Sequence, residues 1–137
     1  MWWVYALLSA FFAALTAIFA KIGIKGVDTD LATAIRTVVI LIIAWAIAFF
    51  RGSATSINTL SRQNLLFLIL SGVATGLSWI FYFKALQIGK VSQVAPVDKL
   101  SVALAILLSA LFLGEALTAK NLVGAVLIIG GTLVLIL

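Results

Sequence analysis

The chain has 137 residues, of which 65% are hydrophobic and only 9% are charged, and its mean hydropathy is +1.32. A soluble domain of this length needs far more charge to cover its surface, which excludes a soluble enzyme or binding domain. The net charge of +5 comes from nine basic residues scattered among predicted helix ends, a distribution that suits lipid headgroups and not nucleic acid. Because the chain has neither cysteine nor histidine, it offers no disulfide, thiol nucleophile or histidine metal site.

Five apolar stretches are long enough to cross a bilayer, which takes about 18 or more residues with few charges. The sequence therefore predicts an all-α, multi-pass integral membrane protein with a single domain, residues 1–137. The expected spans cover approximately residues 2–19, 31–50, 65–88, 92–113 and 120–137. The first stretch lacks a basic leader and an A-x-A-like cleavage site, so we expect a retained span and not a signal peptide. The expected location is the inner (plasma) membrane of a prokaryote.

Arg36 is the first charged residue inside a predicted span. Asp30 precedes the apolar stretch and is a good candidate for the helix N-cap, which places Arg36 six residues, or about 9 Å, along the helix. One interpretation is structural: the side chain returns to the membrane interface, because helical side chains lean towards the N-terminus. The other is functional: a cation at this depth lines a cavity. The sequence favours neither.

The third predicted span carries polar and aromatic groups at its end. Gly72 and Gly76 form a G-x-x-x-G pair that allows close helix packing, a pattern that is also common by chance. Trp79, Tyr82 and Lys84 follow, and we predict that they line a substrate cavity. The structural alternative is an aromatic belt near the far interface, with Lys84 extending to the headgroups.

The start of the fourth span is ambiguous because Pro96 lies close to it. If the helix begins at Ser92, Asp98 and Lys99 lie about two turns inside the membrane. If Pro96 is the first helical residue, Asp98 occupies the third position, where a carboxylate favours the helix dipole. In both cases the side chains of Asp98 and Lys99 leave the helix about 100° apart, so we do not expect them to pair with each other. Ser101 is a further candidate for the cavity.

The connection before the last span has a structural pattern. Gly114 suits a helix C-cap and Thr118 suits an N-cap. Glu115, between them, is expected to bind free amides at the start of the last helix or to pair with Lys120. The last span carries no charge beyond its first residue, and a packing face between helices or subunits is predicted by two glycines a heptad apart, Gly124 and Gly131.

Topology brings the charged residues of the spans to one side of the membrane. The ends of the first and third spans and the starts of the second and fourth share a side, and the charges concerned are Arg36, Lys84, Asp98 and Lys99. Ionisable residues at this depth are costly, and by default they mark a pathway or pair with one another. One carboxylate among several cations predicts a pocket for an anionic or zwitterionic small molecule. Asp98 would form a salt bridge or carry a coupled proton; no metal and no other cofactor is expected.

The basic residues do not fix one orientation in the membrane. One side carries four of them and the other carries three: Lys21, Lys25, Lys84 and Lys90 against Arg51, Arg62 and Lys120. A difference of one is too small to set the topology by the positive-inside rule. We therefore expect insertion in both orientations and an antiparallel homodimer, which would reproduce the inverted-repeat plan of many secondary transporters.

Four stretches of the chain carry a family resemblance. They are G-L-S-W-I-F-Y-F-K-A-L in the third span, P-V-D-K-L-S at the start of the fourth, the F-L-G-E-A-L-T turn, and the final G-A-V-L-I-I-G-G. Together they resemble the EamA domain of the drug/metabolite transporter superfamily, over essentially the whole chain. The resemblance implies one five-helix half of a transporter, since family members usually carry two such domains in inverted orientation around a central substrate cavity. A homodimer or a partner half is therefore implied.

One feature departs from similar small multidrug exporters, which carry a carboxylate in the middle of the first span for proton and cation coupling. This chain has none there, so a cationic-drug antiporter is not expected. The sequence favours a secondary transporter that moves a small metabolite or drug-like solute by alternating access, as a homodimer. A dual-topology small ion channel and a non-transporting accessory subunit are the alternatives. An enzyme is not expected, because no nucleophile–base pair or metal cluster is present.

Overall fold

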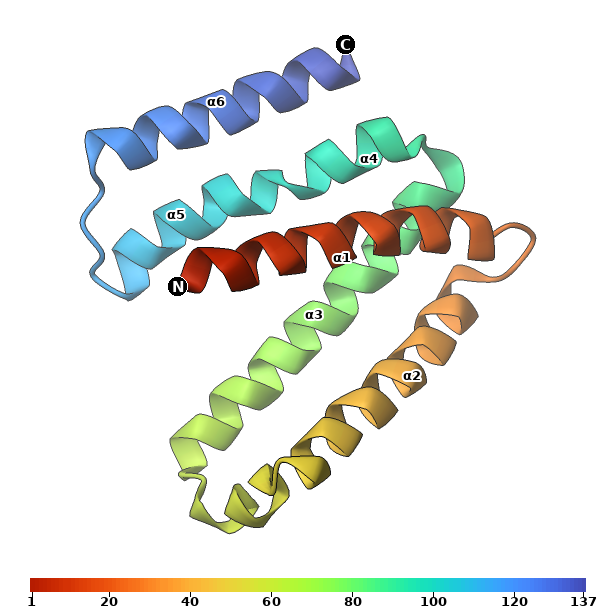
Figure 1. The fold of residues 1–137 in the computed structure, drawn as a ribbon. Helices are drawn as coiled ribbons and strands as arrows, with labels where there is room; N and C mark the ends of the chain where they lie inside the picture. The colour runs from red at the N-terminus through yellow and green to blue at the C-terminus, as the bar shows by residue number, and fades with distance from the viewer. The chain divides into compact units, whose positions relative to one another are not determined.

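The computed structural model describes all 137 residues, and every regular element is helical (Figure 1). The elements in chain order are α1 (Trp2–Gly23), α2 (Thr29–Phe50), η1 (Ser53–Thr59), α3 (Arg62–Ile88), α4 (Val91–Asp98), α5 (Leu100–Phe112) and α6 (Ala119–Ile136). Five segments are long and apolar enough to cross a membrane, with α4 and α5 together forming the fourth, Val91–Phe112. The predicted all-helical membrane protein with five candidate spans is thus confirmed.

The chain divides into two compact units. The first unit is residues Ala20–Gln87 and contains the last turn of α1, α2, η1 and α3; we call it the α2–α3 unit. The second unit is residues Met1–Phe19 together with Ile88–Leu137; we call it the α4–α6 unit.

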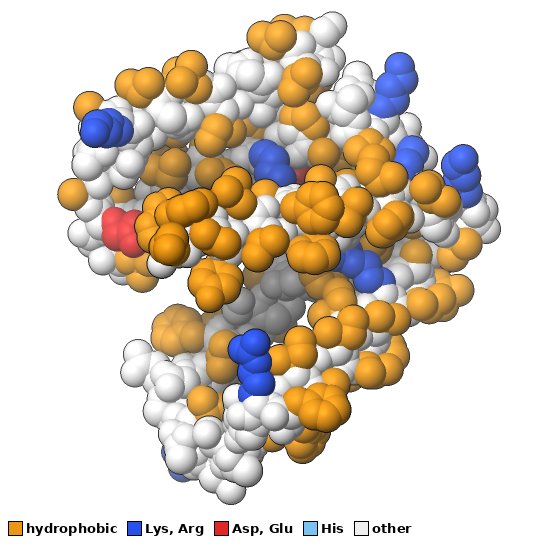
Figure 2. Space-filling view, viewed as in Figure 1, with side chains coloured by type: hydrophobic (Ala, Val, Ile, Leu, Met, Phe, Trp, Pro, Cys, Tyr) orange, Lys and Arg blue, Asp and Glu red, His pale blue; other side chains and the backbone are white.

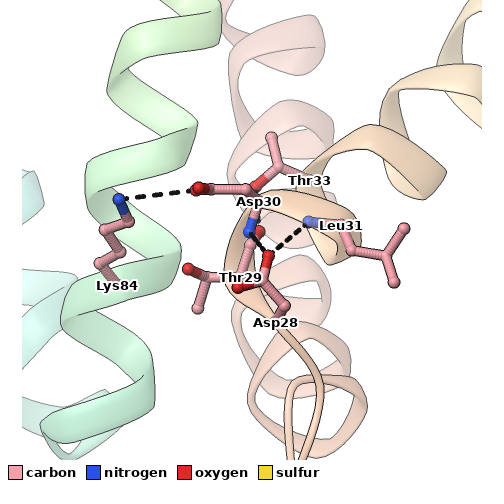
Figure 3. Close-up of polar contacts among 6 residues, drawn as sticks. All are labelled: Asp28, Thr29, Asp30, Leu31, Thr33 and Lys84. Atoms are coloured by element: carbon pink, nitrogen blue, oxygen red, sulfur yellow. Dashed lines mark hydrogen bonds and ion pairs between the residues drawn. The ribbon is translucent and has the colours of Figure 1, made fainter.

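The α2–α3 unit begins with a helix cap that differs from the prediction. Asp28 has extended backbone angles (φ −61°, ψ 132°) and its Oδ1 accepts hydrogen bonds from the N–H groups of Asp30 (2.9 Å) and Leu31 (3.0 Å) (Figure 3). Asp28 is therefore the N-cap, and the assignment of this role to Asp30 is wrong. Asp30 lies already within the first turn of α2, so its carboxylate is available for another partner.

Helices α2 and α3 are antiparallel and joined by η1 (Figure 1). The turn into η1 needs Gly52, whose φ of 71° lies in the left-handed region that strains other residues. At the start of α3, Ser61 Oγ accepts a hydrogen bond from the N–H of Asn64 (3.0 Å). Near the other end, the Gln87 side-chain amide donates to Val27 O (3.1 Å), which ties the end of α3 to the connection before α2.

In the α4–α6 unit, the fourth span begins at Val91 and contains Pro96. The alternative that places Pro96 at the first helical position is therefore wrong. The span is interrupted at Lys99, whose N–H bonds both Ala95 O (3.2 Å) and Pro96 O (3.1 Å). The N–H of Val102 in turn donates to Lys99 O (3.0 Å), so the chain tightens locally towards a 3₁₀ turn. One turn earlier, Pro96 has no N–H to donate to Ser92 O, so the helix also lacks one hydrogen bond before this interruption.

A buried polar contact joins α6 to α4. Thr132, which is buried, bonds through Oγ1 to Pro96 O (3.2 Å) and to Ile128 O in its own helix (2.8 Å). The α5–α6 connection turns at Gly114, which has a φ of 69°, and Thr118 Oγ1 caps α6 by accepting from the N–H of Asn121 (3.2 Å).

Glu115 does not act as expected in this connection. Its side chain forms neither a hydrogen bond to the amides of α6 nor an ion pair with Lys120, and it is exposed. Its contribution is a backbone one: its N–H donates to Ser109 O (3.3 Å).

Little of this apolar chain is buried by the chain itself. In no span is more than 11% of the apolar window buried, so the hydrophobic side chains seen over the face in Figure 2 are available to lipid or to other protein. A Cβ built at any of the glycines assigned to packing faces (Gly72, Gly76, Gly124 and Gly131) would meet no atom within 4 Å. These faces are therefore open within one chain, and their role in packing stays a prediction.

Candidate functional site

One face of α2 carries a row of polar side chains. Thr29, Thr33 and Thr37 recur every four residues, and Arg36 lies on the same face, three residues after Thr33. Thr33 Oγ1 donates to Thr29 O and Thr37 Oγ1 donates to Thr33 O, both at 2.8 Å. Thr29 and Thr33 are buried. The hydroxyl protons of Thr33 and Thr37 are therefore already used within the helix, and beside them the donors that this face still offers are those of Arg36.

Arg36 contacts two aromatic rings of α3. Its guanidinium carbon lies 4.1 Å from the centroid of the Trp79 ring and 5.1 Å from that of Phe83. Trp79 and Phe83 are one helical turn apart on α3, and Phe83 is only 2% exposed. Such a contact stabilises the cation by about 0.5–2 kcal/mol, depending on how far water is excluded. Arg36 is thus held against the aromatic side chains of α3.

Lys84 has a carboxylate partner on α2. Its Nζ lies 3.6 Å from Asp30 Oδ1, as Figure 3 shows across the gap between the two helices. Both side chains are exposed, at 54% and 61%, so in water the pair would add at most about 1 kcal/mol. The pair matters because the carboxylate of Asp30 balances the positive charge of Lys84 within the chain.

The remaining polar groups at this end of the unit support the helices. Tyr82 is half-buried, and its ring centroid lies 6.3 Å from that of Phe83 at an interplanar angle of 38°. The Lys21 ammonium group, in the last turn of α1, donates to Leu86 O. Four predicted site residues (Arg36, Trp79, Tyr82 and Lys84) therefore belong to the α2–α3 unit.

Asp98, Lys99 and Ser101 belong to the other unit, at the interruption between α4 and α5. Lys99 Nζ lies 3.4 Å from Asp98 Oδ2, so the expectation that these neighbours do not pair is wrong. The expectation assumed a regular helix, whereas the backbone departs from one at Lys99, and a long lysine side chain can turn back. Ser101 is exposed, and its hydroxyl forms no hydrogen bond within the chain.

Together these contacts account for every acidic residue of the chain. The four acidic residues are Asp28, Asp30, Asp98 and Glu115. Asp28 caps α2, Asp30 and Asp98 pair with lysines, and Glu115 lies exposed in the α5–α6 connection. Arg36 is therefore a cation within a span that has aromatic neighbours but no carboxylate.

Sequence reasoning missed three features of this site. Asp30 was assigned to capping alone, although the shared topology of the end of α3 and the start of α2 could have identified it as a partner for Lys84. Phe83 shares a face of α3 with Trp79, four residues earlier, but it is absent from the predicted site residues. The threonine row at Thr29, Thr33 and Thr37 is a helical-period signal that ends beside Arg36.

Comparison with known proteins agrees with this architecture. A protein of a Sinorhizobium species, named as an uncharacterized transporter in the cobO 3′ region, is 48% identical over 134 residues, which cover 98% of this chain and 95% of the relative. An uncharacterized protein of Methanocaldococcus jannaschii is 36% identical over 74 residues, or 54% of each chain. No solved structure matches.

The chain also matches the EamA-like transporter family over its whole length, residues 1–137. The description of that family, the name of the Sinorhizobium relative and the five candidate spans together indicate a multi-pass membrane transporter whose substrate is unknown. The chain belongs to the EamA-like transporter family.

Proposed function

We propose that the chain is one half of a secondary transporter, which works as an antiparallel homodimer and moves a small anionic or zwitterionic solute by alternating access. The supporting observation is the exposure of its intramembrane charges. Lys84 and Asp30 are 54% and 61% exposed, and Lys99 and Asp98 are 58% and 36% exposed. Charges turned towards lipid are costly, so these faces need a polar enclosure. A second copy of the chain would supply it.

The number of spans and the balance of basic residues support an antiparallel arrangement. Five spans put the two ends of a chain on opposite sides of the membrane, and basic residues divide four to three between the sides. Two copies inserted in opposite orientations would form an inverted repeat. In transporters built on that plan, substrate and coupling sites lie at the repeat interface near the bilayer midplane.

We assign proton coupling to Asp98. It is the only carboxylate of the fourth span, and it lies beside the interruption at Lys99, an irregularity of the kind that transporters use for ion sites. The proposal includes no catalytic chemistry and no other cofactor. The Sinorhizobium relative supports a location in the inner membrane of a bacterium.

The orientation is tested with single cysteines, which is clean because the chain has none of its own. One variant carries Ser56→Cys in the α2–α3 connection and the other carries Leu137→Cys at the end of the chain. With an odd number of spans between them, these positions lie on opposite sides of the membrane. Intact cells are treated with a membrane-impermeant thiol reagent, and permeabilised cells give the total.

Partial labelling at both positions, from two populations of opposite orientation, supports the antiparallel homodimer. Labelling at one position only means a single orientation and overturns it. Transport is tested separately in liposomes containing the purified chain. Flux that saturates with solute and follows an imposed solute or proton gradient supports a carrier, whereas single-channel currents across a planar bilayer would identify a channel. Absence of both would leave an accessory subunit.

A further inference from the structure

We infer that Arg36 binds the carboxylate group of a monoanionic solute, and that Trp79 and Phe83 hold its guanidinium group in position for this. The inference rests on the proposed function, because it names the chemical class of the solute. It rests on three observations: the contact of Arg36 with the two rings, the pairing of the other cations of the spans, and the use of the neighbouring hydroxyl protons within α2.

The first step is a charge count over the interior of the spans. Lys84 is balanced by Asp30 and Lys99 by Asp98, each within 4 Å. Lys21, at the end of α1, donates to a backbone carbonyl. Arg36 is the cation deeper within a span that has no carboxylate partner, since the remaining carboxylates are the cap of α2 and the exposed Glu115. Away from the span ends, each copy therefore presents one uncompensated positive charge. In an antiparallel pair the two Arg36 residues would lie towards opposite sides of the membrane, so the count applies to each copy separately. A solute with one negative charge neutralises this charge, whereas a dianion leaves one negative charge and a zwitterion leaves the positive one.

The second step concerns the shape of the donor group. A guanidinium is planar and presents its N–H donors as a fork, which matches the two oxygens of a carboxylate in a bidentate pair. Aromatic contacts attract the charge of Arg36 but supply no oxygen acceptor. The hydroxyl groups of Thr33 and Thr37 already donate to backbone carbonyls, so Arg36 is the main donor available to an oxyanion on this face.

The third step concerns Trp79 and Phe83, which are positioning residues. A flexible arginine loses side-chain entropy when it binds a ligand, and contacts that restrict it beforehand reduce this loss. Phe83 is almost fully buried and therefore fixed, and Trp79 is half-buried one turn away. An aromatic ring at position 79 should preserve binding, whereas an aliphatic side chain should weaken it.

The test measures the chemical reactivity of Arg36 directly. Arg51→Lys and Arg62→Lys leave Arg36 as the only arginine, and modification by phenylglyoxal is followed by mass spectrometry. The protein is purified in dodecyl maltoside, which has no anionic group that could occupy the guanidinium. The probes are propionate and benzoate, compared with propionamide, benzamide, alanine, malonate and phenyl phosphate. Each is added at about 10 mM, roughly tenfold above the upper end of usual KM values.

At least one monocarboxylate should slow the modification of Arg36 by about tenfold, as expected for a site that is mostly occupied. Its amide, which has the same shape without the charge, should have no effect. Equal protection by the amide, stronger protection by malonate or phenyl phosphate, or absence of protection by both monocarboxylates overturns the inference. Protection that needs added phospholipid and does not respond to solute would identify a lipid headgroup as the partner, and also overturns it.

Variants give a second readout by isothermal titration calorimetry with the protecting monocarboxylate. Arg36→Gln should weaken binding by about 30-fold or more. Arg36→Lys keeps the positive charge but lacks the paired N–H donors of the guanidinium, so it should restore only part of the lost affinity. Trp79→Phe should bind within a few-fold of the natural chain, and Trp79→Leu about tenfold more weakly. Equal binding by Trp79→Phe and Trp79→Leu contradicts the positioning role.

The charge count has its own test. Asp30→Asn releases Lys84 and gives each chain a second uncompensated positive charge, so the preference should shift from propionate towards malonate by about tenfold. Combining it with Lys84→Gln removes that charge and should restore the preference for propionate. If the preference for propionate over malonate is the same in both variants, the number of uncompensated charges in the spans does not determine the charge of the solute.

Failure of this inference can be distinguished from failure of the proposed function. Carboxylate binding without any flux in liposomes would support binding by Arg36 and contradict the proposed transport. Conversely, saturable flux of an uncharged or cationic solute that is unchanged by Arg36→Gln keeps the transporter and removes the inference.

Discussion

The guanidinium carbon of Arg36 lies 4.1 Å from the centroid of the Trp79 ring, and this contact joins the two long helices of the α2–α3 unit eight residues beyond the cap of α2. At 1.5 Å per residue, it lies about 12 Å along the helix from Asp28. The Asp30–Lys84 pair and the Gln87–Val27 hydrogen bond lie nearer the helix ends. Specific contacts between α2 and α3 therefore concentrate at one end of the pair.

Trp79→Leu should lower the free energy of unfolding in detergent by about 1–2 kcal/mol, because it removes the cation–π contact together with some apolar contact area. A double-mutant cycle with Arg36→Gln isolates the pairwise energy, expected at about 0.5–2 kcal/mol. The matched control is Trp45→Leu, since Trp45 has only Phe49 of its own helix as an aromatic neighbour and no cation. A coupling energy near zero, or the same coupling between Trp45 and Arg36, would contradict the contact.

Asp98→Asn should abolish uptake driven by an imposed proton gradient, because an amide cannot bind and release the coupled proton. Dimerisation should persist, since asparagine keeps the size and the polar character of the aspartate side chain. The measurement is solute uptake into liposomes with and without the gradient, with chemical crosslinking to follow the dimer. Glu115→Gln, in the exposed α5–α6 connection, is the control and should keep its coupling. Coupling that survives in Asp98→Asn would remove this residue from the mechanism.

The general architecture was accessible from sequence for a simple reason. A bilayer leaves the backbone few choices, and stretches of about 20 apolar residues without charge become helices. Thus five spans could be predicted without any knowledge of their contacts. Their ends were less accessible, because capping depends on which of several suitable residues leaves the helical conformation. Asp28 and Asp30 both have capping side chains, and only the backbone angles distinguish them.

The site was accessible only in part, for a related reason. Residue type identified Arg36, Trp79 and Lys84 as unusual for a span, but pairing depends on the register between helices, which no single helix encodes. On a regular helix the side chains of Asp98 and Lys99 would point about 100° apart. The local 3₁₀ hydrogen bonds at Lys99 break that regularity, and the two side chains pair.

Thr132→Val should weaken the packing of α6 on α4 by about 0.6 kcal/mol, a typical value for a hydrogen bond between membrane helices. Valine keeps the shape of threonine and removes the hydroxyl that bonds to Pro96 O. Thr132→Ser should retain most of the effect. Thr75→Val is the matched control, because Thr75 Oγ1 is exposed and bonds only to Ser71 O in its own helix. Unfolding in detergent measures the stability of all three variants. Equal losses of stability in Thr75→Val and Thr132→Val would show that the hydrogen bond to Pro96 O does not stabilise the packing of α6 on α4.

Gly114→Ala and Gly130→Ala should change stability in opposite directions. Gly114 turns the chain after α5 with a φ of 69°, where an alanine Cβ costs about 1–2 kcal/mol through its own backbone, even though no neighbouring atom lies within 4 Å of it. Gly130 lies inside α6 with equally open surroundings and an ordinary φ, so alanine there should stabilise the helix by up to about 1 kcal/mol. Unfolding of the detergent-solubilised chain compares the two. A neutral Gly114→Ala would contradict the left-handed conformation of this turn. A loss in Gly130→Ala that appears only at protein concentrations where dimers form would instead place this face of α6 between the two copies.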